Sequence, residues 1–266
     1  MTELQKVCWA VLEQMKTVEN DWGYHLSYSR ESAWRPDARF LILTLNPSSV
    51  DSLAKGRSKP EKPIYMLDPW ALDGRCDFFA HDYRISPCVR ALFYELALLN
   101  GEKKGANAAE RLKIAEEFAD HHCPIASCVP YRTRTGKQIA PRMWEFAMEK
   151  QWPAIFDVWL PEVIIVMGKD AYKKMVEFLG TRLKPLVGPQ GHQQKKIEEL
   201  APNRKTRLQY EYSRFLSGEK NVTVIYIPHP TGAHGYTGLP RDLERDCGEA
   251  GTPFRQFLNM LYAKRA

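Results

Sequence analysis

The sequence predicts an α/β protein in which a parallel sheet lies between two layers of helices. Four short runs of consecutive apolar residues, rich in Val, Ile and Leu, are typical of parallel strands that are buried on both faces. They lie near residues 40–45, 123–128, 163–167 and 222–227. Apolar residues at helical spacing fill much of the sequence between these runs. We therefore expect a three-layer α/β/α sandwich with a central four-stranded parallel sheet, built as a single domain over residues 1–266.

Composition narrows the class of protein. The chain has 266 residues, of which 44% are hydrophobic and 26% charged, as in an ordinary folded domain. A net charge of +6 favours an acidic partner only weakly. No apolar run reaches the roughly 18 residues of a membrane span, and the first residues do not resemble a signal peptide. Six cysteines without a CxxC pair indicate reduced thiols. We expect a cytoplasmic monomer with no metal, no other cofactor and no membrane contact.

The chain begins with an N-terminal helical extension over about residues 1–37. Its helix is expected from about Glu3 to Glu19, followed by an aromatic loop to Asp37. The first strand then runs directly into Asn46, at the position where a strand tip holds a side chain over a ligand. Asn-Pro is also a common start of a simple turn, so both interpretations of Asn46 stay open.

A long irregular segment, residues 50–83, follows the first strand and has the length of a binding loop. Phe78 and Phe79 are candidates for stacking on a flat ligand, and equally for anchoring the core. Helices are expected from Ser86 to about Leu99 and from Asn107 to about Asp120.

The second strand leads into a basic turn that contains Arg132 and Arg134. These arginines suggest phosphate contact, with a solvated loop as the alternative. A helix is expected over 142–156, and the third strand ends at Gly168 before a further helix. 

Residues 181–220 form what we interpret as a basic insertion. It carries nine Lys or Arg against four Glu, a balance of +5 in a chain whose net charge is +6. Such a concentration indicates either a polyanion contact or a solvated face. A last helix is expected over about 252–264.

The fourth strand is followed by a loop in which a histidine lies between two prolines. Pro228 and Pro230 flank His229 and stiffen the backbone around it, and ligands of open α/β sheets bind at the carboxyl ends of the strands. His229 is therefore a candidate site residue, with a structural turn as the alternative.

With these strand ends and the loops after them identified, the chain resembles the uracil-DNA glycosylase superfamily, and most nearly its mismatch-specific and single-strand-selective branches. Thr44-Leu45-Asn46-Pro47-Ser48 stands where those branches have Gly-x-Asn-Pro-Gly, and His229-Pro230-Thr231 is similar to their His-Pro-Ser. Between the two motifs, the third strand with Gly168 and the helix after it resembles the corresponding family segment. The resemblance covers about residues 40–260.

The resemblance implies a DNA glycosylase that leaves an abasic site, with DNA as its partner. Asn46 is then expected to orient a water, and His229 to donate a hydrogen bond to the departing base. The base must first leave the stack, as in base excision and DNA repair. His234 and Tyr236 are candidates for the side chain that fills the gap. Further DNA contacts are expected from Ser48, Ser49, Arg132, Arg134, Thr231 and Gly232.

Ser127 departs from the family pattern, in which an Asn on the second strand reads the uracil edge. Serine cannot make that paired amide contact, and its small size leaves room. We expect a uracil-like or modified pyrimidine, for example a bulky 5-substituted cytosine of phage DNA, which would suit a role in phage defence. Phe78 and Phe79 would contact the base with Ser127.

Two other classes of function compete with this hypothesis. The same fold with an idle site would bind DNA or a modified base without cutting it. An unrelated α/β hydrolase would need a GxSxG nucleophile elbow, which the sequence lacks.

Overall fold

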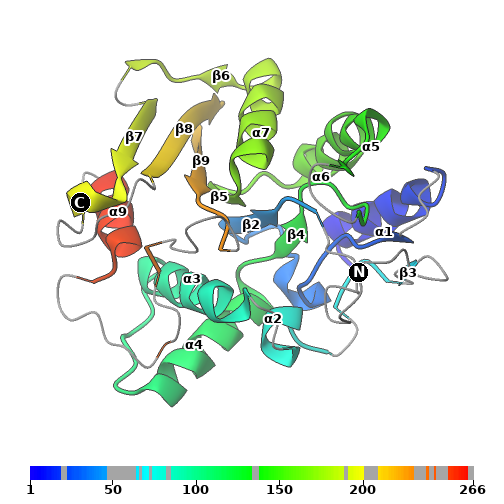
Figure 1. Ribbon diagram of the computed structural model, residues 1–266. Helices are drawn as coiled ribbons and strands as arrows, with labels where there is room; N and C mark the ends of the chain where they lie inside the picture. The colour runs from blue at the N-terminus through cyan, green and yellow to red at the C-terminus, as the bar shows by residue number, and fades with distance from the viewer. Residues whose placement is uncertain are drawn as a thin grey trace.

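The structure of the protein is a computed structural model (Figure 1). The structure describes residues 1–18, 23–46, 64–65, 68–71, 74–81, 85–133, 138–188, 191–200, 209–230, 238–239, 243 and 251–262, with the backbone alone at 64–65 and 197–198. The helices are α1 (Glu3–Met15), a 3₁₀ turn (Glu31–Ala33), α2 (Asp77–Ala80), α3 (Ser86–Leu99), α4 (Ala108–His121), α5 (Pro141–Phe146), a π-helical turn (Ala147–Gln151), α6 (Trp152–Val158), α7 (Lys169–Arg182), α8 (Ile197–Leu200) and α9 (Pro253–Tyr262). The strands are β1 (Gly23–Tyr24), β2 (Phe40–Thr44), β3 (Ile64–Tyr65), β4 (Ile125–Ser127), β5 (Val163–Met167), β6 (Lys184–Pro185), β7 (His192–Lys196), β8 (Gln209–Ser217) and β9 (Lys220–Ile227).

The central sheet is mixed. Strands β4, β2, β5 and β9 lie side by side in that order and are parallel, as the four apolar runs predicted. The sheet then continues with antiparallel β8, and both β6 and β7 pair with β8. The prediction of a four-stranded sheet is therefore wrong: the described sheet has seven strands.

The extra strands come from the segment interpreted as a basic insertion. β8 and β9 form a hairpin whose two-residue loop is Gly218-Glu219, because Ser217 pairs with Lys220. Gly218 has a φ of +60°, the conformation that such tight hairpins need at this position. Much of 181–220 is thus part of the sheet, while residues 201–208, which hold Arg204, Lys205 and Arg207, lie outside the described residues.

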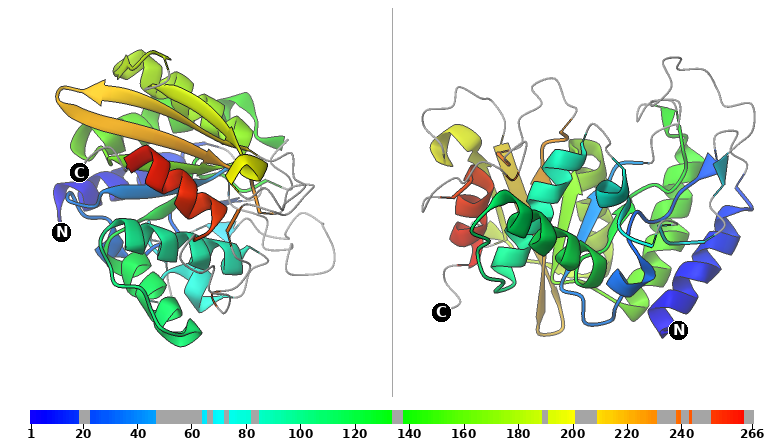
Figure 2. Two further views of the ribbon diagram at one scale, coloured as in Figure 1. Left: turned by 90° about the vertical axis from the view of Figure 1, so that its left-hand side faces the viewer. Right: turned by 90° about the horizontal axis from the view of Figure 1, so that it is seen from below.

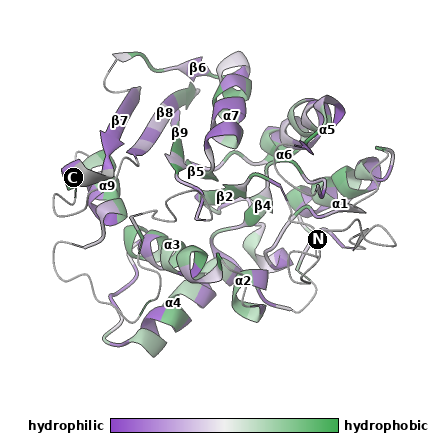
Figure 3. Cartoon of the chain, viewed as in Figure 1, coloured by the Kyte–Doolittle hydropathy of each residue, from purple (hydrophilic) through white to green (hydrophobic). Residues whose placement is uncertain are grey.

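Helices cover both faces of the sheet (Figure 2). Alternation along β2 sends Leu41 and Leu43 into a core with α1, α6 and α7, and sends Phe40 and Ile42 into a core with α3, α4 and α9. Figure 3 shows the same division by hydropathy: β2 and β4 are hydrophobic, whereas β7 at the edge is hydrophilic. 

The helices begin where local signals predict them. Thr2 and Gln5 form a reciprocal capping box before α1, and the Asn107 side chain accepts a hydrogen bond from the Glu110 N–H at the start of α4. The predicted helices at 86–99 and 107–120 are confirmed within a residue.

A π-helical turn interrupts the helical stretch 141–158. It places the side chains of Gln151 and Trp152 against the end of β4: Gln151 Nε2 donates to the Ser127 carbonyl at 3.2 Å, and Trp152 Nε1 donates to the Cys128 carbonyl at 2.8 Å. Both side chains are fully buried. The turn therefore fixes the position at which β4 ends.

Candidate functional site

Asn46 and His229 lie beyond the carboxyl ends of two parallel strands of one sheet, β2 and β9. Strand β5 runs between them, so their backbones are separated by two strand spacings, about 10 Å. Where β5 ends at Met167, the chain turns through Gly168 with a φ of +106°. Met167 packs on the same face of the sheet as Ile42 of β2 and Ile227 of β9, so this face is apolar up to the ends of the three strands.

Asn46 is half-buried and is held by its amide nitrogen. Nδ2 donates to Thr133 Oγ1 at 2.8 Å and lies 3.5 Å from the Tyr131 carbonyl oxygen. These two contacts fix the plane of the amide and assign Oδ1 as its acceptor atom. An acceptor in a fixed position is what the orientation of a water requires.

His229 is half-buried, directly after the buried Pro228. Burial lowers the pKa of its imidazole below the ordinary value of 6.5. The ring is therefore neutral at pH 7 and carries one N–H, which it can donate to a developing negative charge.

Ser127, the expected base-reading residue, is 0% exposed. It is the register partner of Thr44, which is 4% exposed, so the two side chains lie next to each other on one face of the sheet. Ser127 Oγ donates to the hydroxyl of Tyr28 at 3.4 Å. The hydroxyl end of the Tyr28 side chain thus lies against the short serine, where room for the base was expected.

Tyr28 belongs to a segment that the sequence suggested was only a loop. Residues 23–29 run antiparallel alongside β4 and the residues after it, with bridges at Tyr24–Tyr131 and Ser27–Ala126. The hydrogen bonds that hold this segment are Ser127 N to Leu26 O (3.0 Å), Tyr28 N to Ile125 O (2.9 Å), His25 N to Pro130 O (2.7 Å) and Arg132 N to Gly23 O (2.9 Å). The segment therefore covers the outer edge of β4 and brings its own polar side chains to the site.

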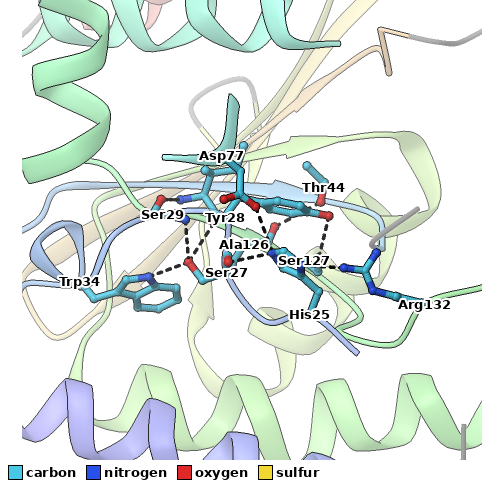
Figure 4. Close-up of polar contacts among 11 residues, drawn as sticks. His25, Ser27, Tyr28, Ser29, Trp34, Thr44, Asp77, Ala126, Ser127 and Arg132 are labelled. Carbon is cyan, nitrogen blue, oxygen red and sulfur yellow. Dashed lines mark hydrogen bonds and ion pairs between the residues drawn. The ribbon is translucent and has the colours of Figure 1, made fainter. Parts of the chain in front are cut away.

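His25, Asp77 and Arg132 form a buried polar network with Tyr28 (Figure 4). Arg132 Nη2 donates to His25 Nδ1 at 2.9 Å, and His25 Nε2 donates to the Ser27 carbonyl at 2.9 Å. Asp77 Oδ2 lies 3.6 Å from the same Nε2. Burial, and then the positive charge of Arg132, lower the pKa of His25 to about 3, so the network contains a neutral histidine with its hydrogen on Nε2.

This network gives Arg132 a different position from the one expected. Arg132 is 9% exposed, and its guanidinium is directed inward, onto His25. The geometry favours an internal structural role for Arg132 over the expected phosphate contact.

Phe78 and Phe79 are also buried, at 2% and 7% exposure. The Phe78 ring lies 5.1 Å from that of Tyr28, and the Phe79 ring lies 5.9 Å from that of Phe93 in α3. Their positions correspond to the core alternative, with Phe78 supporting Tyr28 from behind.

The remaining expected DNA contacts lie outside the described residues. They are Ser48, Ser49, Arg134, Thr231, Gly232, His234 and Tyr236. 

A second polar cluster, which we call the Lys169 cluster, lies on the α7 side of β8 and β9. Lys169 forms an ion pair with Glu211, and its ammonium lies 5.3 Å from the ring centre of Tyr172 and 5.0 Å from that of Tyr226. Ser213 completes the cluster, 2.9 Å from the Tyr172 hydroxyl. Lys169 follows Gly168 directly, so the cluster begins at the same edge of the sheet as Asn46 and His229.

No three His, Cys, Asp or Glu side chains gather as a metal site among the residues described. In the same part of the chain, no helix has the length and apolar character needed to cross a membrane. Comparison with protein-family models and with curated protein sequences finds no match. 

The sequence did not single out His25, Tyr28 or Asp77. A signal was present in the alternation of Tyr24 and Leu26 with polar residues, which is typical of a strand. The aromatic and polar character of the surrounding residues obscured it.

Proposed function

We propose that this protein is a DNA glycosylase that hydrolyses the N-glycosidic bond of a flipped-out modified pyrimidine. The observation that carries the proposal is the placement of Asn46 and His229 beyond the ends of β2 and β9, about 10 Å apart across Gly168. That spacing suits a single sugar and base held between the two side chains. The motif resemblance to the uracil-DNA glycosylase superfamily supports the same assignment.

The chemistry requires two different kinds of stabilisation. As the glycosidic bond breaks, the sugar becomes positive and the base becomes negative. A neutral His229 donates a hydrogen bond to a carbonyl oxygen of the departing base, and its neutrality avoids the cost of burying a cation. Asn46 has no useful pKa as a general base, and acts by orienting the water that attacks the sugar carbon.

The residues at the end of β4 support a choice of base. Ser127 is fully buried and bonded to Tyr28, so no amide at this position makes the paired contact that identifies uracil. We infer that excision is not restricted to uracil, and that a 5-substituted cytosine of the kind found in phage DNA is a suitable substrate.

The experiment is a base-release assay on labelled oligonucleotides, single-stranded and double-stranded. Uracil, a thymine mismatch, 5-hydroxymethylcytosine and its glucosylated form are each placed at one position, and alkali reveals abasic sites. We expect release of a modified cytosine by the wild-type protein and a loss of at least about 100-fold in Asn46→Ala and His229→Ala.

Tyr172→Phe is the matched control, because it removes a buried hydroxyl that is hydrogen-bonded to Ser213 on the other face of the sheet. Efficient release of uracil alone would contradict the substrate assignment. DNA binding without release of any base would identify a binding module on this fold.

A further inference from the structure

We propose that the hydroxyl of Tyr28 is the group that reads the polar edge of the base, in place of the amide expected on β4. This inference rests on the proposed function, and it names a specificity-determining residue that neither motif contains. Its basis is the contacts that bring three hydroxyl side chains, those of Tyr28, Thr44 and Ser127, together on the sheet (Figure 4).

Of these three residues, Tyr28 is the least buried. Thr44 is 4% exposed and Ser127 is 0% exposed, whereas Tyr28 is half-buried. A base that enters the site therefore meets the Tyr28 side chain before the two smaller ones. Thr44 Oγ1 lies 3.4 Å from the Ala126 carbonyl oxygen, to which it donates, so this side chain is anchored to β4.

Tyr28 is also close to the candidate catalytic residues. It bonds to Thr44, the last residue of β2, which precedes Asn46 by two residues, at most about 7 Å along the chain. By the alternation of side chains along β2, Thr44 and Asn46 lie on the same face. Ile225 and Ile227 of β9 pack on that face too, and His229 follows them at the same spacing. The Tyr28 hydroxyl thus lies at the face of the sheet from which Asn46 and His229 extend.

The position of Tyr28 is fixed from several directions. Its backbone N–H donates to Ile125 O at 2.9 Å, and its carbonyl accepts from Asp77 N at 2.8 Å. Its ring stacks on His25 with centroids 4.3 Å apart and contacts Phe78 at 5.1 Å. A group held in this way is preorganised for recognition and loses little freedom when a ligand binds.

Hydroxyl groups differ from an amide in a way that matters for substrate choice. Burial raises the pKa of Tyr28, so the hydroxyl keeps its proton at pH 7 and is both a donor and an acceptor. Because Ser127 Oγ donates to this hydroxyl and Thr44 Oγ1 donates to the Ala126 carbonyl, the Tyr28 O–H is the donor in its bond to Thr44. A lone pair of the Tyr28 oxygen therefore accepts from the 4-amino group of a cytosine, whereas donation to the 4-oxygen of a uracil would break the bond to Thr44. An amide presents its oxygen and its nitrogen in fixed places and favours one of the two. The Tyr28 hydroxyl therefore allows cytosine-type bases to enter a site of this kind.

The test combines a change in the protein with a change in the base. Tyr28→Phe removes the hydroxyl and keeps the ring. The base that the wild-type protein releases is compared with the analogue that lacks its 4-substituent, a 2-pyrimidinone with the same 5-substituent. We expect Tyr28→Phe to lower kcat/KM about 10- to 100-fold on the 4-substituted base and less than about 3-fold on the analogue.

An equal loss on both bases would assign Tyr28 a purely structural role and overturn the inference. The absence of a loss on either base would also overturn it. Tyr172→Phe should leave the ratio between the two bases unchanged, and thermal unfolding of both variants shows whether either has lost its fold. If the wild-type protein releases no base, the proposed glycosylase activity fails. The same comparison is then made with dissociation constants for oligonucleotides that contain each base. Equal affinities for the two bases would then overturn this inference as well.

Discussion

The polar network around Tyr28 and the Lys169 cluster lie on opposite faces of one sheet, and their charged groups differ in exposure to water. The Tyr28 network is buried and places two neutral groups, His25 and Tyr28, between the charges of Arg132 and Asp77. The Lys169 cluster is built around an ion pair, in which the Lys169 side chain is 35% exposed and that of Glu211 is 9% exposed.

The difference shows where each kind of interaction is stable. Water reaches Lys169 and solvates its charge, so the ion pair contributes little and is sensitive to salt. Around His25, burial opposes protonation, and hydrogen bonds replace the water that the side chains have lost. The network therefore depends on complete pairing, and the removal of one member exposes the others to the full cost of burial.

Replacing Arg132 should have the largest effect on stability. Arg132→Leu keeps much of the side-chain volume but leaves His25 Nδ1 without the donor it has at 2.9 Å. We expect the free energy of unfolding to fall by about 2–4 kcal/mol in urea denaturation. Arg35→Leu is the control, because Arg35 pairs with Asp37 in solvent, and it should cost less than about 1 kcal/mol. Similar losses in the two variants would remove the contrast between buried and exposed charge.

His25 should make stability depend on pH. Its pKa is about 3 in the folded protein and 6.5 in the unfolded chain, so the unfolded chain binds the proton first as pH falls. Stability is fully present above pH 6.5 and should decline by about 1.5 kcal/mol between pH 6.5 and pH 5 because of this group. The measurement is urea unfolding of the wild-type protein and of His25→Gln, which does not titrate and should give a flatter profile. Parallel profiles would show that His25 is not held neutral.

The Lys169–Glu211 pair should have the smallest effect. A double-mutant cycle with Lys169→Met and Glu211→Gln should give a coupling energy of about 0.5–1 kcal/mol at low salt. Added sodium chloride should reduce that coupling, because the pair is partly exposed. A coupling that stays constant from low to high salt would mean that this cluster is as isolated from water as the Tyr28 network.

The parallel half of the sheet could be predicted because its strands are buried on both faces. In β2 and β5 every residue is buried, so the apolar character is continuous and visible in the sequence. Asn46 and His229 could be singled out for the same reason, because each follows such a strand directly.

The antiparallel half was missed because its two faces differ. In β8, Tyr210 and Tyr212 pack against Phe257 of α9, whereas Glu211 faces the side of α7 and pairs with Lys169. The resulting alternation of aromatic and polar residues was hidden among the charges of the segment, which favoured a solvated insertion.

The Tyr28 network could not be predicted, because its polar residues are buried only through partners far along the chain. His25 is satisfied by Arg132, and Ser127 Oγ by the hydroxyl of Tyr28. Such burial is a property of pairs that the fold creates, and no local pattern records it. 

The π-helical turn at Ala147–Gln151 holds one residue more than the α-helical turn it replaces. The extra residue is taken up within this turn, so α5 and α6 keep nearly the orientation of two halves of one uninterrupted helix. Removal of one residue from this turn should therefore restore an ordinary helix and leave Gln151 and Trp152 facing the β4 carbonyls. Removal of one residue from the regular part of α6 would instead rotate the two sides of the deletion by about 100° relative to each other. This turn is therefore the place where the helical stretch can change in length by one residue without moving the end of β4.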